Sequence, residues 1–243
     1  MFNPFKRKVP IPDTKEWLQE AVKFYRPMGF YEQYQGLGDD EFFSKWIELQ
    51  EEDREGEERD EIEVFSEMLK ETYQNLNRKR REWEFEVAVS TLDCSFLGKD
   101  KNRIWWDDLE VDIFHGDDTY KKLLQEWSKI SRGAFVPTEV NEIWQSEKGP
   151  LQIEVMLYGD RFLLTPNRYY VNPEEHYGWI NLEVLNQINE VLGEANYLKK
   201  QDIRFEAHQA FDQTAFVLAL TSEEKEKMRK ERGWKFADLT ESY

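Results

Sequence analysis

The residues most able to do chemistry are acidic ones that gather at positions 107–118. The acidic residues are Asp107, Asp108, Glu110, Asp112, Asp117 and Asp118, and one histidine, His115, lies among them. Mg²⁺ and Ca²⁺ prefer oxygen ligands of this kind. If the apolar residues between them form the buried face of a strand, Asp108, Glu110 and Asp112 share its other face. This arrangement defines one possible function, a Mg²⁺-dependent hydrolase with a carboxylate or His115 as base.

The same residues also have a purely structural interpretation. Alternation with apolar neighbours is typical of a half-exposed strand, and Asp117 and Asp118 can cap a following helix. The stretch also lacks the loop pattern of an EF-hand. We therefore predict no metal ion and no cofactor.

The possible nucleophiles do not form a catalytic motif. Cys94 is the single cysteine, and it lies in an apolar, strand-like run that favours a buried, reduced thiol and a cytoplasmic protein. His115, His176 and His208 lack the spacing of a zinc-binding helix, and no phosphate-binding glycine loop is present. We predict that the protein is not an enzyme and name no catalytic residue.

Negative charge is concentrated in one part of the chain. Between Asp39 and Glu63 there are thirteen acidic and three basic residues, a net charge of −10 within a chain of net charge −17. Such a field attracts cationic partners and repels nucleic acid. The run also lacks apolar residues around residues 51–60, so these side chains must face water. The residues predicted to bind a protein partner with a basic surface are Glu51, Glu52, Asp53, Glu57, Glu58 and Asp60, with Trp46 as a nearby aromatic anchor. The alternative is a solvated helix end and linker.

Two other features bear on the partner. The basic residues 78–81 beside Trp83 could contact phosphates, but a chain with a pI near 4.7 is repelled by nucleic acid. No apolar stretch is long enough to cross a membrane. We predict neither a nucleic-acid nor a membrane partner. Trp105 and Trp106 point to opposite sides of a predicted strand, so one of them is expected at the surface unless both sides are buried. An exposed Trp beside carboxylates is typical of an interface that captures Arg and Lys.

The elements expected to position these residues change character along the chain. Apolar spacing predicts a helix capped by Asp13, a second that begins at Asp39 or Asp40, and a third over residues 62–76. From Trp83 the apolar period becomes 2, which predicts a strand. The sequence thus predicts a helical region, 1–83, and an α+β domain, 84–243, which could also form one compact unit.

The second region mixes helices and hairpins. We predict a helix after Asp117 and Asp118, a hairpin in 151–166 with Gly159 and Asp160 as its loop, and a helix ended by Gly193. Two strands follow between residues 202 and 220, and Thr221 with Glu224 predicts a capping box for the last helix. The fold class is α+β, with a helical N-terminal third followed by a mostly antiparallel sheet with packed helices.

Three fragments between residues 135 and 236 carry a family resemblance. They read FVPTEVNEIWQSEKGPLQIEV, GWINLEVLNQINEVL and FDQTAFVLALTSEEKEKMRKERGWKF. This part resembles bacterial immunity proteins of polymorphic toxins and SMI1/KNR4-like proteins, which are acidic, Trp-rich α+β proteins. The resemblance implies a bacterial protein that binds and neutralises a cationic toxin, and it transfers no individual binding residue. The helical third lies outside the resemblance, which leaves a structural adaptor as a further alternative.

Overall fold

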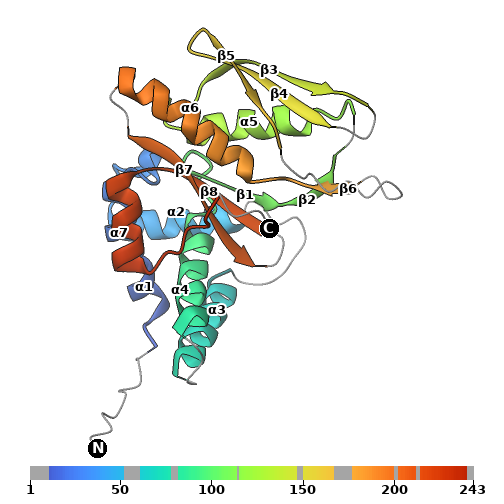
Figure 1. The fold of residues 1–243 in the computed structure, drawn as a ribbon. Helices are drawn as coiled ribbons and strands as arrows, with labels where there is room; N and C mark the ends of the chain where they lie inside the picture. Colours follow the sequence, from blue (N-terminus) through green and yellow to red (C-terminus); the bar gives the residue numbers. More distant parts are fainter. Residues whose placement is uncertain are drawn as a thin grey trace, which may run out of the picture. The chain divides into compact units, whose positions relative to one another are not determined.

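The computed structural model describes residues 11–51, 61–77, 82–113, 115–146, 150–166, 177–199, 202–211 and 214–239. Within them an all-helical N-terminal region precedes small antiparallel sheets with packed helices, so the predicted α+β class is confirmed (Figure 1). The chain divides into two compact units. The helical unit contains residues 1–100 and 231–235, and the α+β unit contains residues 101–230 and 236–243. The predicted boundary after residue 83 falls within a helix of the first unit.

The helical unit begins as the sequence predicts. Asp13 caps the first helix, because its Oδ1 accepts a hydrogen bond from the amide of Lys15 at 2.9 Å. The second helix starts at Asp39, directly after Gly38, whose amide donates to Glu41 Oε2 at 3.0 Å. The helices are α1 (Thr14–Tyr25), α2 (Asp39–Glu51), α3 (Glu61–Asn77) and α4 (Glu82–Leu97), with short 3₁₀ turns η1 (Arg26–Met28) and η2 (Glu32–Tyr34).

An aromatic cluster forms the core of the helical unit. The fully buried ring of Phe96 lies with its centroid 5.5 to 6.5 Å from five other rings. These rings belong to Trp17, Tyr25, Tyr31, Phe42 and Trp46. Most pairs meet edge-on or tilted, the geometry that aromatic pairs prefer. The Phe96 carbonyl accepts a hydrogen bond from Trp46 Nε1 at 3.0 Å, which satisfies a buried indole.

The strand predicted from Trp83 is wrong, because this segment forms α4. Six of the eight residues from Ser90 to Leu97 are buried, including the polar Ser90 and Asp93. A helix that is buried on most sides has no apolar stripe of period 3.6. The sequence of α4 therefore shows no helical period that could compete with the alternation of apolar and polar residues at 83–89. The prediction that Cys94 is buried is confirmed, although the residue lies in a helix.

A second segment, residues 231–235, completes the helical unit. Arg232 forms an ion pair with the buried carboxylate of Asp93, and its guanidinium lies 5.1 Å from the ring centroid of Trp17. Trp234 Nε1 donates to Tyr25 Oη at 2.9 Å and to Asp93 Oδ2 at 3.2 Å. Burial raises the pKa of the Asp93 carboxyl, and the Arg232 charge opposes that rise. A buried charge needs such partners, so these contacts fix residues 231–235 to the N-terminal helices.

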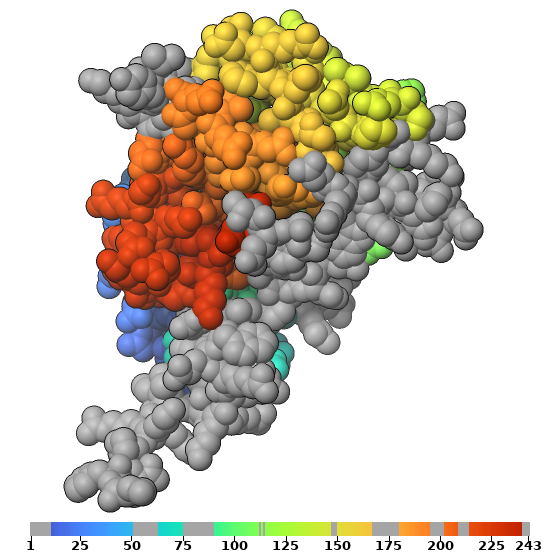
Figure 2. Space-filling view, viewed as in Figure 1, coloured from blue at the N-terminus to red at the C-terminus, as the bar shows by residue number. Residues whose placement is uncertain are grey.

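The α+β unit contains a three-stranded sheet in the order β3–β4–β5. Its strands are β3 (Pro137–Trp144), β4 (Leu151–Leu157) and β5 (Asp160–Leu164). The inner residues of β4 are buried and the outer ones half-buried, so one face packs on the core. Figure 2 shows the surface of β4 and β5, in yellow, beside that of the helix α6 (Glu183–Lys199), in orange. The predicted stop at Gly193 is wrong, because α6 continues to Lys199.

The turn between β4 and β5 lies one residue earlier than predicted. Its two loop residues are Tyr158 and Gly159, with φ of 58° and 95°. Positive φ at both positions matches a type I′ turn, whose twist fits a two-residue hairpin. The hydroxyl of Tyr158 also donates to the carbonyl of Ala134, and this contact holds a non-glycine residue in the left-handed region.

The remaining strands pair as two further antiparallel groups. The sheet β1–β8–β7 joins β1 (Ile104–Asp108), β8 (Thr214–Thr221) and β7 (Ile203–Phe211), while β2 (Glu110–Asp112) pairs with β6 (Tyr177–Trp179). Before β3, the helix α5 (Thr119–Ile130) buries Leu124 and Trp127. The helix α7 (Ser222–Arg232) begins with the predicted capping box, since Glu224 Oε2 accepts from the Thr221 amide at 2.8 Å and Thr221 Oγ1 accepts from the Glu224 amide at 3.2 Å.

Among the described helices, none combines the length and the apolar character that crossing a bilayer requires.

Candidate functional site

Most of the predicted binding residues cannot be placed. Glu51 is the last residue of α2, while Glu52, Asp53, Glu57, Glu58 and Asp60 lie outside the described residues, as do the basic residues 78–81. The flanks of the acidic run belong to α2 and to α3, and both are described. The described acidic side chains on either side of residues 52–60 therefore belong to these two helices.

Trp46, the predicted anchor, lies in the core of the helical unit. Its side chain is 2% exposed, and its ring stacks on Phe96 at an interplanar angle of 25°. A side chain with this burial presents no surface to a partner, so we leave Trp46 out of the proposed interface. Its apolar spacing in the sequence already matched the buried face of α2, which is the signal for a packing role.

The acidic residues of α2 are engaged locally. Asp40 pairs with Lys15 at 2.8 Å, and Glu48 pairs with Lys45 at 2.6 Å. Asp39 lies 3.7 Å from Arg26, whose Nη2 also donates to two backbone carbonyls, those of Tyr34 and Leu37. Together with the bond from the Gly38 amide to Glu41, these contacts account for the described acidic side chains of α2 by helix capping and ion pairing within the unit.

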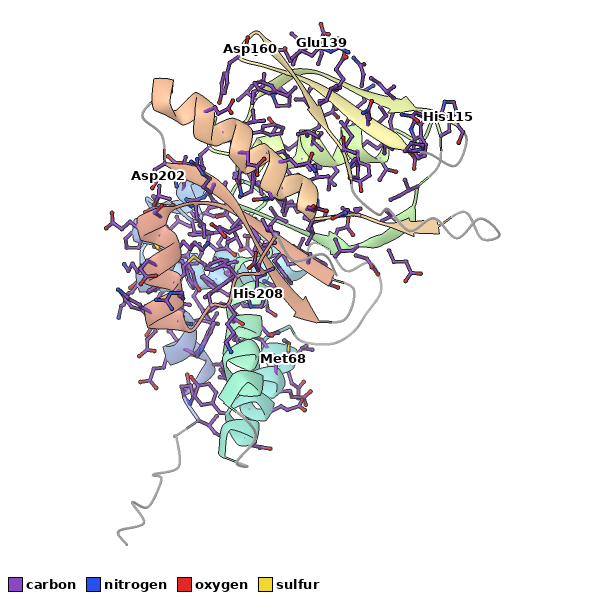
Figure 3. All side chains as sticks on the ribbon, viewed as in Figure 1. Met68, His115, Glu139, Asp160, Asp202 and His208 are labelled. Carbon is purple, nitrogen blue, oxygen red and sulfur yellow. The ribbon has the colours of Figure 1, made fainter. Side chains whose placement is uncertain are left out.

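The acidic residues of α3 are different. Glu63, Glu67 and Glu71 recur at every fourth position, so they form one row along the helix, and all three are exposed. Phe65 and Leu69 are buried on the opposite side. Within the described part of the chain, no Lys or Arg lies at ion-pair distance from these three carboxylates. We call Glu63, Glu67 and Glu71 the α3 carboxylate row; Figure 3 labels Met68 on the same helix.

The members of the α3 carboxylate row repel one another. Like charges four residues apart on a helix cost about 0.2 to 0.5 kcal/mol for each pair. The predicted binding set omitted Glu63, Glu67 and Glu71, because it was taken from the stretch that lacks apolar residues, which ends before Ile62. The repeat of Glu at every fourth position was the signal that could have found them.

The carboxylates at 107–118 are divided between different elements. Asp108 ends β1, whereas Glu110 and Asp112 belong to β2, which pairs with a different strand. Asp107 Oδ1 accepts the amide of Asp108, and Asp108 Oδ1 accepts the amide of Glu110, both at 2.9 Å. The described residues contain no group of three or more His, Cys, Asp or Glu side chains placed to hold a metal ion. The Asp112 side chain lies outside that description.

The N-terminus of α5 is capped by two carboxylates. Asp117 Oδ1 accepts the amide of Thr119 at 3.1 Å, and Glu142 Oε1, from β3, accepts the amide of Lys121 at 3.1 Å. Asp118 occupies the cap position with φ of 57° and makes no side-chain cap bond, contrary to the prediction. Burial raises the pKa of Glu142, although the amide of Lys121 and the indole of Trp144 oppose the rise. Helix capping therefore explains Asp117 and Glu142.

Cys94, the candidate nucleophile, and the histidine His208 are both buried. Burial raises the pKa of the Cys94 thiol well above its usual range, and the negative charge of Asp93 adds to this rise. Such a thiol is protonated and unreactive near neutral pH. His208 in β7, labelled in Figure 3, is 1% exposed, and burial lowers its pKa to about 4. His208 is therefore a neutral packing residue near neutral pH, and His115 is exposed on a turn.

No family model, curated protein or solved structure matches this chain. The resemblance of residues 135–236 to toxin immunity proteins stays a prediction.

Proposed function

We propose that the protein is a non-catalytic binding protein whose acidic helical unit captures a protein partner with a basic surface. The α3 carboxylate row carries this proposal. Three exposed carboxylates lie on one helix face, each spaced to repel the next. A cationic partner would relieve that repulsion on binding and would be attracted before contact.

The resemblance to immunity proteins supplies a class of partner. A toxin that acts on nucleic acid carries a basic surface, and an acidic protein that covers it blocks access to the substrate. We propose a cytoplasmic bacterial role of this kind, in which Glu51 to Asp60 and the α3 carboxylate row steer the encounter. The high net charge of −17 is consistent with such steering.

A pull-down at low salt tests the proposal. The intact chain is compared with Glu63→Gln/Glu67→Gln/Glu71→Gln and with the control Glu139→Gln/Glu190→Gln/Glu194→Gln, in which three exposed acidic residues of the α+β unit are neutralised. The control has the same net charge and includes two residues with the same four-residue spacing. We expect the captured protein to be retained by the intact chain and by the control.

The captured protein is then purified and its dissociation constant measured by calorimetry. Neutralising the α3 carboxylate row should weaken binding about tenfold at low salt and far less at high salt, since exposed charges act over a screening length of about 10 Å at 0.1 M. Equal weakening of binding in both variants would show that only the net charge matters, and it would contradict a specific role for the α3 carboxylate row. The toxin assignment fails if the purified partner does not impair cell growth when it is expressed alone.

A further inference from the structure

The strand β3 is an edge of the sheet β3–β4–β5, since β4 is its one partner strand among the described residues. The register and the two-residue loop of the neighbouring hairpin determine which residues of β4 bond to β5. The residues between them bond to β3, and Glu154, for example, is paired with Asn141. Because backbone groups alternate along a strand, those of Val140 and Glu142 point away from the sheet.

These outward backbone groups have no hydrogen-bond partner among the residues that the structure describes. Val140 packs its side chain in the core of the α+β unit. The carboxylate of Glu142 accepts from the Lys121 amide and from Trp144 Nε1, and these bonds leave its own amide and carbonyl unused. An unpaired edge of this kind is a template to which another extended chain can add by backbone hydrogen bonds.

Other strand edges of the α+β unit are closed by side chains of α6. Asn189 accepts from the amide of Phe205 in β7 and donates to the carbonyl of the same residue, both at 2.8 Å. Gln187 makes the same pair of bonds with Thr165, directly after β5, at 2.8 and 2.7 Å. Natural sheets cover their edges in such ways to prevent unwanted pairing. At Val140 and Glu142 the edge of β3 has no such cover among the described residues.

The side chains beside this edge indicate what kind of strand it accepts. Glu139, Asn141 and Ile143 alternate along the outer face of β3 and are exposed; Figure 3 labels Glu139. The strand contains two acidic residues, Glu139 and Glu142, and no basic one. A second copy of this chain would bring the same acidic strand and a net charge of −17, so repulsion disfavours self-pairing.

We propose that the edge of β3 binds an extended segment of a protein partner by strand addition, with a basic residue opposite Glu139 and a β-branched apolar residue opposite Ile143. In antiparallel pairing the residues opposite Val140 and Glu142 exchange backbone hydrogen bonds with them. Opposite charges and β-branched side chains that meet across two strands add to the affinity. This proposal rests on the proposed function only for the basic character of the partner.

The test uses a defined peptide and requires no captured protein. The peptide acetyl-Thr-Ile-Lys-Thr-Val-Arg-Thr-amide places its Ile opposite Ile143 and its Arg opposite Glu139 when it pairs antiparallel. A control peptide has the same sequence and charge but carries methyl groups on the backbone nitrogens of its Lys and Val, which face Glu142 and Val140. We expect the control to bind about tenfold more weakly in an NMR titration of the full chain, because it lacks the two N–H groups that bond to β3.

Hydrogen exchange of the wild-type chain, followed by NMR, locates the bound peptide. At saturation the amides of Val140 and Glu142 should exchange at least about tenfold more slowly. The amides of Arg161 and Leu163, which point outward from β5 at the other edge of the sheet, should not change. Unchanged exchange at Val140 and Glu142, or equal affinity for the two peptides, would overturn the proposal. Protection of the β5 amides in their place would assign the peptide to β5 and reject the β3 edge.

The same amides also report on self-association. If Val140 and Glu142 become protected in the protein alone as its concentration is raised, a second copy covers β3, and the proposed occupant is wrong. Because these measurements use the wild-type chain, poor folding of a variant does not prevent a decision.

Matched variants test the side-chain contacts. Ile143→Thr should weaken peptide binding about threefold, whereas Leu163→Thr, which changes an exposed apolar residue of β5, should not. Glu139→Gln should weaken it only about twofold, since an exposed ion pair contributes little. The pull-down control that contains this substitution should therefore keep its partner. Neutralising the α3 carboxylate row should leave the peptide affinity unchanged within about twofold at high salt, so the β3 edge and the proposed function can fail independently.

Discussion

His208 links the stability of the protein to pH. In the folded chain burial lowers its pKa to about 4, whereas in the unfolded chain the imidazole titrates near its ordinary value of 6.5. Between these two values the unfolded state binds more protons than the folded state, so the free energy of unfolding decreases as the pH falls. Above pH 6.5 both states hold a neutral imidazole, and His208 adds no pH dependence.

We expect this single group to lower the free energy of unfolding by about 3 kcal/mol between pH 7 and pH 4. Urea unfolding near pH 7 and near pH 4.5, for the wild type and for His208→Gln, measures the contribution as the difference between their pH slopes. His115→Gln is the matched control, because His115 is exposed on a turn. Parallel slopes for the wild type and His208→Gln would contradict the prediction.

Single residues show what sequence alone can and cannot place. The burial of Cys94 and the exposure of one residue of the pair Trp105 and Trp106 followed from local patterns, since apolar runs are buried and strand neighbours alternate. The role of Trp46 did not, because an acidic neighbourhood says nothing about which way an aromatic side chain in a helix points. Its position on the apolar stripe of α2 was the better guide.

At the scale of elements, the start of α7 concentrates several stabilising contacts on one carboxylate. Glu224 closes the capping box with Thr221 and also pairs with Arg132, whose Nη1 lies 2.7 Å from Glu224 Oε2. Arg103, a side chain only 6% exposed, lies 3.6 Å from the same carboxylate. The helix start, the loop after α5 and the turn before β1 therefore depend on Glu224 together.

We predict that Glu224→Ala lowers the free energy of unfolding by about 2 to 3 kcal/mol, because it removes a cap and the carboxylate next to a buried guanidinium. Glu223→Ala is the control, since Glu223 is exposed in the same helical turn and should change stability by less than about 0.5 kcal/mol. Chemical denaturation followed by circular dichroism compares the two. Similar losses for both variants would show that the contacts of Glu224 are not what stabilises α7.

Elements whose signals are local were predictable. The Asp13 cap, the capping box of Thr221 and Glu224, and the hairpin of β4 and β5 all depend on residues a few positions apart. The hairpin loop was placed one residue late, because Tyr158 adopts a positive φ that sequence assigns to glycine or asparagine. The helix α4 was missed because tertiary burial, and not an amphipathic pattern, determines it.

At the scale of the whole chain, the α+β class was predictable but the composition of the units was not. The helical unit includes residues 231–235, and Arg232 and Asp93 are 139 positions apart in the sequence. No short-range pattern signals such a contact. For the candidate site, the local charge density was visible in the sequence. Which carboxylates of α2 are paired was not, because Asp39 and Asp40 pair with Arg26 and Lys15, which come from earlier elements.

We expect a chain that ends at Lys230 to lose the stability of its N-terminal helices. It lacks Arg232 and Trp234, which leaves Asp93 as a buried carboxylate without its cation and removes a side chain that is 1% exposed. Loss of a buried partner charge alone costs about 3 to 5 kcal/mol. Limited proteolysis should cleave between residues 11 and 100 in this chain and spare a control that ends at Leu239. Equal resistance of the two chains would contradict the prediction.

The discontinuous helical unit also sets the order of events during protein synthesis. The ribosome must add the 130 residues between Asp100 and Glu231 before the nascent chain contains every part of that unit. At typical elongation rates this interval lasts roughly 10 s. During this interval Trp234 has not been added, so the aromatic residues of α1, α2 and α4 cannot yet pack with it. The helical unit is thus completed last even though most of it is translated first, so products that terminate before Glu231 lack part of it.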